Sequence, residues 1–419
     1  MGTLKPYYGW FVVAVVFTSM GVAIGGGQYA FGVFVEPLVD QFGWSRTQVN
    51  ASLSFSAIAG LLAPLVGRVM DKVGARPVVA VSALLIAFSY LLRPFMTELW
   101  HYYALSAIQF AGFPGAAMLP AARLVSIWFP EKRGRMMGVT AMGANFGGVT
   151  MPAMASFIVM SAGWQWGFAS LGIIGAGVAV ASVLLVREAP ATVSDGLEGP
   201  DEGRVAGVTR LDRSGLTVRE AVHSVSFYAV VVGVLAATFT YPAVLTQLIP
   251  HLQNEGLPLS QAALYVSFMA IFGMAGKVLF GYLTERIPSK NVLTLSLVIQ
   301  SLGLAVLITV PDTPLLWVAL PVYGLAFGGM GALFPLLVQD SFGMAHFGAL
   351  FGLVNLATVG SALAGPLLVG VVFDSTGSYR LALLIVIGIY AVGAAALRLA
   401  TPFRSEIEGA NMPALAVVK

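Results

Sequence analysis

One lysine lies inside an otherwise uncharged stretch that is long enough to cross a membrane. The run from Ser260 to Leu283 contains a single charged residue, Lys277. About 20 such residues cross the hydrocarbon core of a bilayer, and a charge within them is costly and marks a path for a substrate or an ion. Lys277 could extend along the helix to the nearer membrane face, because Gly281 follows four residues later. Alternatively, it faces a watery central cavity and attracts a small anion.

The composition of the whole chain requires a membrane environment for this lysine. The 419 residues are 58% hydrophobic and only 10% charged, whereas soluble domains carry about 25% charged residues. The apolar runs are about 20 residues long without strict alternation, which predicts helices rather than a barrel. Cysteine is absent, so disulfides and thiolate metal sites are excluded. We expect no metal, no cofactor and no nucleic-acid partner.

Twelve spans are predicted, six on each side of a polar linker. They cover approximately 10–34, 48–67, 77–96, 100–128, 136–160, 164–187, 224–249, 260–283, 291–310, 314–338, 346–371 and 380–400. The linker, 188–222, is rich in proline, glycine and charged residues. The predicted fold is therefore an all-α membrane protein with two six-helix bundles, 1–187 and 223–404, and a tail over 405–419.

The basic residues predict the orientation of the spans. If the N-terminus is cytoplasmic, most lysines and arginines fall on the cytoplasmic side, and only Arg46, Arg93 and Arg380 fall outside. Cytoplasmic loops of membrane proteins carry such an excess. We therefore expect a multi-pass protein of the inner (plasma) membrane, monomeric in the lipid bilayer, with both termini in the cytoplasm.

Two short loops at matching positions of the two halves share a pattern of glycine, acid and base. The predicted gating residues are Gly67, Asp71, Lys72 and Arg76 after the second span, and Glu285 and Arg286, which follow Gly281, after the eighth. Glycine permits close helix approach, and the acid can pair with a base or cap a helix. This pattern indicates a charged latch at the inner gate, although a plain positive loop would also fit.

The first of these loops, Gly67–Pro77, reads G-x-x-x-D-K-x-G-x-R-P and resembles the signature of the major facilitator superfamily. Three further stretches, Tyr29–Phe34, Trp128–Arg135 and Gly365–Tyr379, are similar to the branch that contains monocarboxylate transporters and the oxalate–formate antiporter. The resemblance covers almost the whole chain outside the linker and tail. It implies two pseudo-symmetric six-helix bundles that bind substrate between them and alternate access to it.

The resemblance also implies a role for Lys277. A cation in the eighth span of this branch, usually an arginine, binds the substrate carboxylate. Lysine acts as a compact point charge and lacks the bidentate fork of arginine. Two further positions depart from the animal carriers, because Gly273 replaces an aspartate and Val33 a lysine. If protons are coupled to transport, as the resemblance implies, then Lys277, His251 or the substrate must carry them.

The eleventh span contains no lysine or arginine, although the oxalate carrier is expected to use a cation there. A dianion would leave one charge unmatched in a medium of low dielectric, at a cost of several kcal/mol. This favours a monocarboxylate such as lactate, pyruvate or acetate.

Several polar and aromatic residues of the spans are candidates for the wall of this site. Tyr323 and Phe327 are four residues apart and share a helix face, as do Phe351 and Asn355. The complete set of predicted substrate-binding residues is Lys277, Gln28, Tyr29, Asn145, Gln247, Tyr323, Phe327, Phe351 and Asn355. Ordinary helix packing and interhelical hydrogen bonds are the competing explanation for all but the lysine.

Among function classes, a secondary transporter of small organic anions fits best. The chain has no G-x-x-x-x-G-K-[ST] loop for ATP, and its four histidines fall near span ends, where they form no catalytic cluster. An exchanger of other small anions such as oxalate and formate remains an alternative. A multidrug-type efflux carrier is another, although it would usually use an embedded carboxylate. A non-transporting sensor would need a larger soluble domain than 188–222.

Overall fold

The structure, a computed structural model, describes residues 8–129, 133–188, 215–284, 286–309, 314–343 and 346–403. In these ranges eleven helices are long and apolar enough to cross a membrane. The bent pair Leu316–Gly328 and Leu333–Phe342 accounts for a twelfth crossing. The predicted all-α fold with twelve spans is confirmed.

The N-terminal half comprises α1 (Gly9–Met20), η1 (Gly21–Tyr29), η2 (Phe31–Phe34), α2 (Val35–Phe42), α3 (Arg46–Ser54), α4 (Ser56–Val73), α5 (Ala75–Leu92), η3 (Arg93–Phe95), α6 (Leu99–Ala116), α7 (Met118–Trp128), α8 (Arg133–Ala162) and α9 (Trp164–Leu185). The C-terminal half comprises α11 (Val218–Val222), α12 (Val225–Thr238), η5 (Thr240–Leu245), α13 (Leu248–Asn254), α14 (Leu259–Thr284), α15 (Ser289–Thr309), α16 (Leu316–Gly328), α17 (Met330–Phe342), α18 (Phe347–Thr376) and α19 (Arg380–Leu397).

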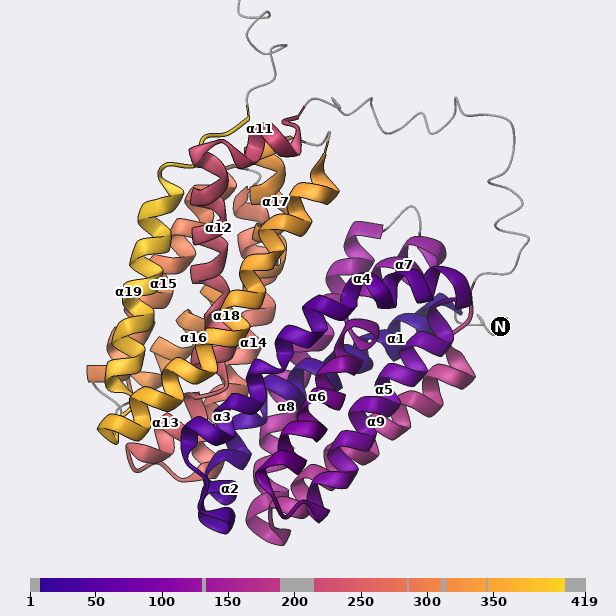
Figure 1. Cartoon of the computed structure of the whole chain (residues 1–419), viewed down its shortest axis with the longest axis vertical. Coiled ribbons are helices and arrows are strands. Elements are labelled where there is room, and N and C mark those ends of the chain that lie inside the picture. The colour runs from indigo at the N-terminus through magenta and orange to yellow at the C-terminus, as the bar shows by residue number, and fades with distance from the viewer. Residues whose placement is uncertain are drawn as a thin grey trace, which may run out of the picture.

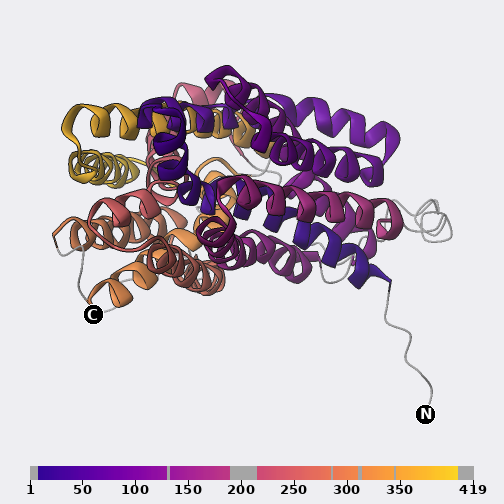
Figure 2. The same ribbon diagram turned by 90° about the horizontal axis from the view of Figure 1, so that it is seen from below.

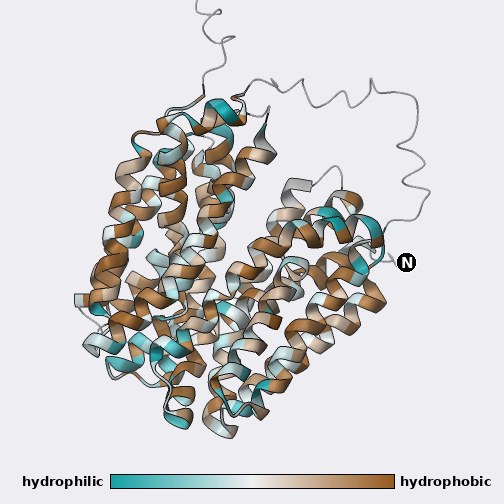
Figure 3. Ribbon diagram, viewed as in Figure 1, coloured by the Kyte–Doolittle hydropathy of each residue, from teal (hydrophilic) through white to brown (hydrophobic). Residues whose placement is uncertain are grey.

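The two halves form separate bundles that lie side by side (Figures 1 and 2). We call the face where α1 begins and α19 ends the termini face, and the face with α2 and α13 the distal face. The ribbons of the two bundles are closest at the distal face and diverge toward the termini face (Figure 1). Large apolar side chains such as Phe157, Val180 and Leu302 are exposed on the outside of the bundles, and polar residues gather at their ends (Figure 3). This distribution suits a hydrocarbon surround.

The helix contacts of one half are repeated in the other. In the first half α5 packs on α9, α4 on α6, and η1 on α8; in the second, α15 packs on α19, α14 on α16, and η5 on α18. Both η1 and η5 are π-helices that interrupt the first span of their half. Such interruptions are rare and frequently occur at functional sites. Between the halves, α8 packs on α14, and α18 packs on α3 and α4.

Glycine allows a close crossing between η1 and α8. A Cβ built on Gly147 would lie 2.2 Å from the carbonyl oxygen of Gly21, and one on Gly25 would lie 2.4 Å from the carbonyl carbon of Gly147. The two backbones therefore touch, as small residues permit between membrane helices.

Replacing Gly147 with alanine should force these helices apart. We expect a destabilisation of about 1–3 kcal/mol, typical of overpacking, seen as a lower midpoint of thermal unfolding in detergent. Gly177→Ala on α9 is the matched control, because a Cβ there meets nothing within 4 Å. It should leave the midpoint unchanged or raise it, since alanine favours a helix over glycine. Equal midpoints for the two variants would contradict the close crossing.

Most of the predicted linker, 189–214, lies outside the described residues, as does 404–419. Residues 215–222, the last part of this linker, are packed against the C-terminal half, whereas a solvated loop was expected. Leu216 N donates to the Phe342 carbonyl at 2.9 Å, and α11 begins with a capping box between Thr217 and Glu220. Hydrogen bonds from the Thr217 backbone N–H and hydroxyl lower the pKa of Glu220. The end of the linker is thus attached to the C-terminal half.

Candidate functional site

Lys277 reaches from one half of the molecule to the other. It lies on α14, and its Nζ donates a hydrogen bond of 2.8 Å to the carbonyl oxygen of Ala141 on α8. The side chain is half-buried, and within the described ranges it forms no ion pair. A cation at the interface of the halves is therefore satisfied by a single neutral oxygen.

Asn145 lies one turn beyond Ala141 on the same helix and is almost fully buried. Its Nδ2 donates to the Ala270 carbonyl on α14 at 3.3 Å and to the Tyr29 hydroxyl of η1 at 3.4 Å. A Cβ on Gly273 would lie 2.6 Å from this Nδ2. The absence of a side chain at Gly273, one turn before Lys277, is what lets the amide of α8 approach α14.

Phe327 supplies an apolar side to the same region. Its ring meets that of Tyr241, on η5, edge-on at a centroid distance of 5.9 Å. Its Cζ would lie 3.4 Å from a Cβ built on Gly273. The structure therefore brings four predicted residues together around the contact of α8 with α14: Lys277, Tyr29, Asn145 and Phe327.

The other predicted residues lie elsewhere. Tyr323 is buried inside the C-terminal half, where its hydroxyl lies 3.1 Å from that of Tyr390. Phe351 stacks on Phe334 at 4.5 Å, and Asn355, one turn further along α18, is half-buried. Gln28 is half-buried in η1.

Gln247 contacts the opposite half near the distal face. It is buried, and its Nε2 donates to Oδ1 of Asn50 on α3 at 2.8 Å. It thus contributes to the joining of the halves, with no contact to Lys277.

A group of charged and aromatic residues joins the halves at the distal face. We call Glu36, Arg46, Phe373, Asp374 and Tyr379 the distal cluster. The guanidinium of Arg46 pairs with Glu36 of its own half. It also donates to the Tyr379 hydroxyl at 2.6 Å and lies 4.2 Å from the centroid of the Phe373 ring. Tyr379 and Phe373 belong to the other half, so this arginine bridges the two bundles.

Asp374 completes the distal cluster by capping a helix of the opposite half. It lies near the end of α18, and its carboxylate accepts hydrogen bonds from the backbone N–H groups of Arg46 at 3.1 Å and Thr47 at 2.9 Å. These are the first residues of α3, whose N–H groups have no partner within the helix. A negative charge is favourable at such a helix start.

His251, one of the four histidines near span ends, is buried beside this cluster and is not solvated. Its ring lies 5.8 Å from that of Tyr379, edge to face, and it is 1% exposed. Burial lowers the pKa of His251.

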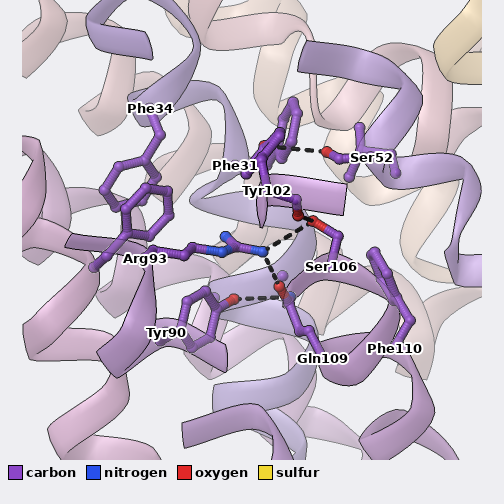
Figure 4. A pocket seen from close by; sticks show the side chains of 13 residues that line it. Phe31, Phe34, Ser52, Tyr90, Arg93, Tyr102, Ser106, Gln109 and Phe110 are labelled. Carbon is purple, nitrogen blue, oxygen red and sulfur yellow. Dashed lines mark hydrogen bonds between the residues drawn. The ribbon is translucent and has the colours of Figure 1, made fainter. Parts of the chain in front are cut away.

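Arg93 is a residue whose burial sequence reasoning missed. It is 5% exposed inside the N-terminal half, a burial that the prediction of its membrane side did not address. Its Nη2 donates to Gln109 Oε1 at 2.5 Å and to Ser106 Oγ at 3.3 Å (Figure 4). The sequence did contain a signal for this special role. Arg93 and Arg46 are basic residues predicted on the outer side of the membrane, where the positive-inside rule disfavours them.

The predicted charged latch lies only partly within the described structure. The side chain of Asp71 and the whole of Glu285 fall outside it, whereas Lys72, Arg76 and Arg286 are exposed and Gly67 is half-buried. Gly74 has a φ of +85°, a backbone conformation that favours glycine.

The Glu188 carboxylate accepts from Ala75 N at 2.9 Å and pairs with Arg123 at 3.2 Å. Glu188 therefore caps the start of α5, and the latch stays a prediction.

Comparisons with known sequences identify the family of the chain. The family model of the Major Facilitator Superfamily matches residues 10–366. Monocarboxylate transporter 13 of Rattus norvegicus is 24% identical over 375 residues, covering 89% of this chain and 84% of the relative. Monocarboxylate transporter 11 of Homo sapiens is 26% identical, with coverages of 90% and 80%. The uncharacterized MFS-type transporter YcxA of Bacillus subtilis (strain 168) is 24% identical, with coverages of 95% and 96%.

Solved structures show the same fold. A D-xylose–proton symporter superposes with a TM-score of 0.72 at 16% identity, covering 94% of this chain and 98% of that one. A bacterial homolog of the human lysosomal transporter Spinster superposes with a TM-score of 0.69, also at 16% identity, with coverages of 94% and 95%. With two six-helix bundles, twelve crossings and a family match over most of its length, the chain belongs to the Major Facilitator Superfamily and is a membrane carrier rather than an enzyme.

Proposed function

We propose that the protein is a secondary transporter of small monocarboxylates, such as lactate, pyruvate or acetate, and that Lys277 binds the carboxylate. The observation that carries this proposal is the hydrogen bond from the Lys277 ammonium to the Ala141 carbonyl across the two halves. The names of the monocarboxylate transporters among its relatives support it.

The chemistry of the site favours exchange of this carbonyl for a carboxylate. The Ala141 carbonyl is a neutral acceptor, whereas a carboxylate would bring a counter-charge to the ammonium in addition to an acceptor oxygen. Asn145 and Tyr29 offer an amide and a hydroxyl nearby, and Phe327 offers an apolar surface for the short carbon chain. Because one cation balances one carboxylate, a dianion such as oxalate would keep an uncompensated charge.

Exchange at Lys277 also links binding to movement of the halves. The lysine of α14 holds α8 through Ala141. A substrate that takes over this ammonium would weaken one contact between the halves, while the distal cluster keeps the distal face closed. Differential binding of this kind shifts the balance between conformations. We propose that the termini face is cytoplasmic, that the protein resides in the plasma membrane, and that protons accompany the substrate on Lys277, on His251 or on the substrate itself.

Uptake into proteoliposomes tests this function. The purified full chain should accumulate labelled lactate, pyruvate or acetate when an inward proton gradient is imposed, and a protonophore should abolish the accumulation. Oxalate should compete weakly, since it carries a second charge. Preferred exchange of oxalate for formate, or transport of hydrophobic cations alone, would contradict the monocarboxylate assignment.

A further inference from the structure

We propose that Arg93 forms a second anion site, inside the N-terminal half and separate from Lys277, and that it takes a small inorganic anion such as chloride. Arg93 lies in η3 at the distal end of a membrane span. It forms no ion pair with any carboxylate in the described part of the chain. Buried ionised groups are normally paired, and a charge within a span marks a functional site by default.

The guanidinium is only partly satisfied by its neighbours. Nη2 has Gln109 and Ser106 as acceptors, but Nε is buried without a hydrogen-bond partner. The rings of Tyr90, Tyr102 and Phe168 lie 4.7–5.2 Å from its Cζ. Ring faces attract the cation, but they provide neither a hydrogen-bond acceptor for Nε nor a counter-charge.

The side chain of Arg93 is among those that line a pocket (Figure 4). Its walls come from η1, α3, α5, α6 and α9, and include Gly26, Ser52, Tyr90, Gln109 and Phe168. Acidic residues are absent from its lining, so nothing there repels an anion. The Tyr90 hydroxyl accepts a hydrogen bond from Gln109 Nε2 at 3.0 Å, which leaves its own proton available to donate. The pocket therefore offers two donors and a positive charge.

Its size selects the class of anion. The space accommodates about one water-sized group, so an organic acid is too large for it, and a halide, which is somewhat larger than water, enters only if the lining side chains move apart slightly. Phe31, Phe34 and Phe110 complete the wall. Aromatic edges carry partial positive charge and tolerate a polarisable, weakly hydrated anion. A halide meets these requirements.

The second half of the molecule supplies an internal comparison. The register that matches Gly67 with Gly281 also matches Arg93 with Leu307, which is 1% exposed. The buried polar network of the C-terminal half is neutral: Thr240 Oγ1 donates to Gln300 at 2.6 Å and lies 2.7 Å from the Tyr390 hydroxyl. By this register the C-terminal half has a leucine where the N-terminal half has Arg93, which makes Arg93→Leu the substitution of choice.

Thermal unfolding of the purified full chain tests the site without any transport substrate. The midpoint should be higher in sodium chloride or bromide than in sodium gluconate of equal ionic strength, by about 2 °C or more and with saturation. Arg93→Leu should abolish this difference, whereas Lys277→Ala should keep it, so failure of the proposed substrate site would not be mistaken for failure of this one. A chloride increment that persists in Arg93→Leu would overturn the proposal.

Bromide provides a second test on the unaltered protein, which applies even if the variant does not fold. Crystals grown in bromide should give an anomalous peak within about 4 Å of the Arg93 Nε or Nη atoms, consistent with a charge-assisted contact to a large anion. Density that refines as water, with no anomalous signal and equal midpoints in chloride and gluconate, would show that Arg93 is hydrated and not an anion site.

Discussion

Lys277→Ala should abolish proton-driven uptake of labelled monocarboxylate into proteoliposomes. The ammonium is the charged group at the α8–α14 contact, and its partner there, the Ala141 carbonyl, is neutral. Loss of one member of a desolvated charge pair costs about 2–5 kcal/mol, and a loss of about 3 kcal/mol weakens binding roughly 100-fold. Expression and monodispersity should be preserved, because the deletion leaves only one carbonyl without its donor.

Lys277→Arg is the informative partner of this variant. Arginine keeps the charge but spreads it over a planar fork, so transport should persist with an altered affinity. If Lys277→Ala transports normally, the lysine has no part in the site. If Lys277→Arg is as inactive as the alanine variant, the compact shape or the titration of lysine is needed, and the charge alone does not explain binding.

Asp374→Asn should open the distal face. The carboxylate caps the first turn of α3 from the opposite half with both oxygens; asparagine keeps the shape, removes the charge and leaves one acceptor oxygen for the two N–H groups. Charge-assisted hydrogen bonds are about twice as strong as neutral ones, so we expect a loss of about 1.4 kcal/mol and a tenfold shift toward distal-open molecules. The chain contains no cysteine. Spin labels at Gln41→Cys and Ser375→Cys, both exposed positions on opposite halves, can therefore report the separation without interference.

Glu255→Gln is the matched control for this experiment. Glu255 pairs with Arg380 at 3.0 Å near the same face, but both residues belong to the C-terminal half. Its loss should therefore leave the distance distribution unchanged. Unaltered distances in Asp374→Asn, or an equal shift in both variants, would mean that the cap across the halves does not hold the distal face closed.

The parts of the structure that depend on hydropathy could be predicted from sequence. The lipid sets the length and polarity of each span, so twelve crossings follow from the apolar runs alone. Lys277 could be singled out for the same reason, because a charge within such a run is conspicuous. Gly25, Gly26 and Gly27 lie in the π-helical part of the first span, and glycine weakens an α-helix.

The sequence did not predict which side chains of each span contact which neighbouring helix. Helical spacing correctly puts Tyr323 and Phe327 on one face, yet the Tyr323 hydroxyl joins Tyr390 inside its own half. The helical period shows that two side chains share a face of a helix, but it does not show whether that face packs within its own bundle or against the other one. The positive-inside rule predicts the membrane side of Arg46 and Arg93, but it carries no information on whether they are buried. Their contacts come from helices distant in sequence.

Equilibrium binding of labelled pyruvate to the purified chain tests the central assignment most directly. Wild type and Lys277→Met should be compared at equal protein, since methionine keeps much of the length of lysine and removes only the positive charge. We predict saturable binding to the wild type and a roughly 100-fold weaker affinity, or none that can be measured, for the methionine variant. Equal affinities would place the carboxylate away from Lys277 and contradict the account.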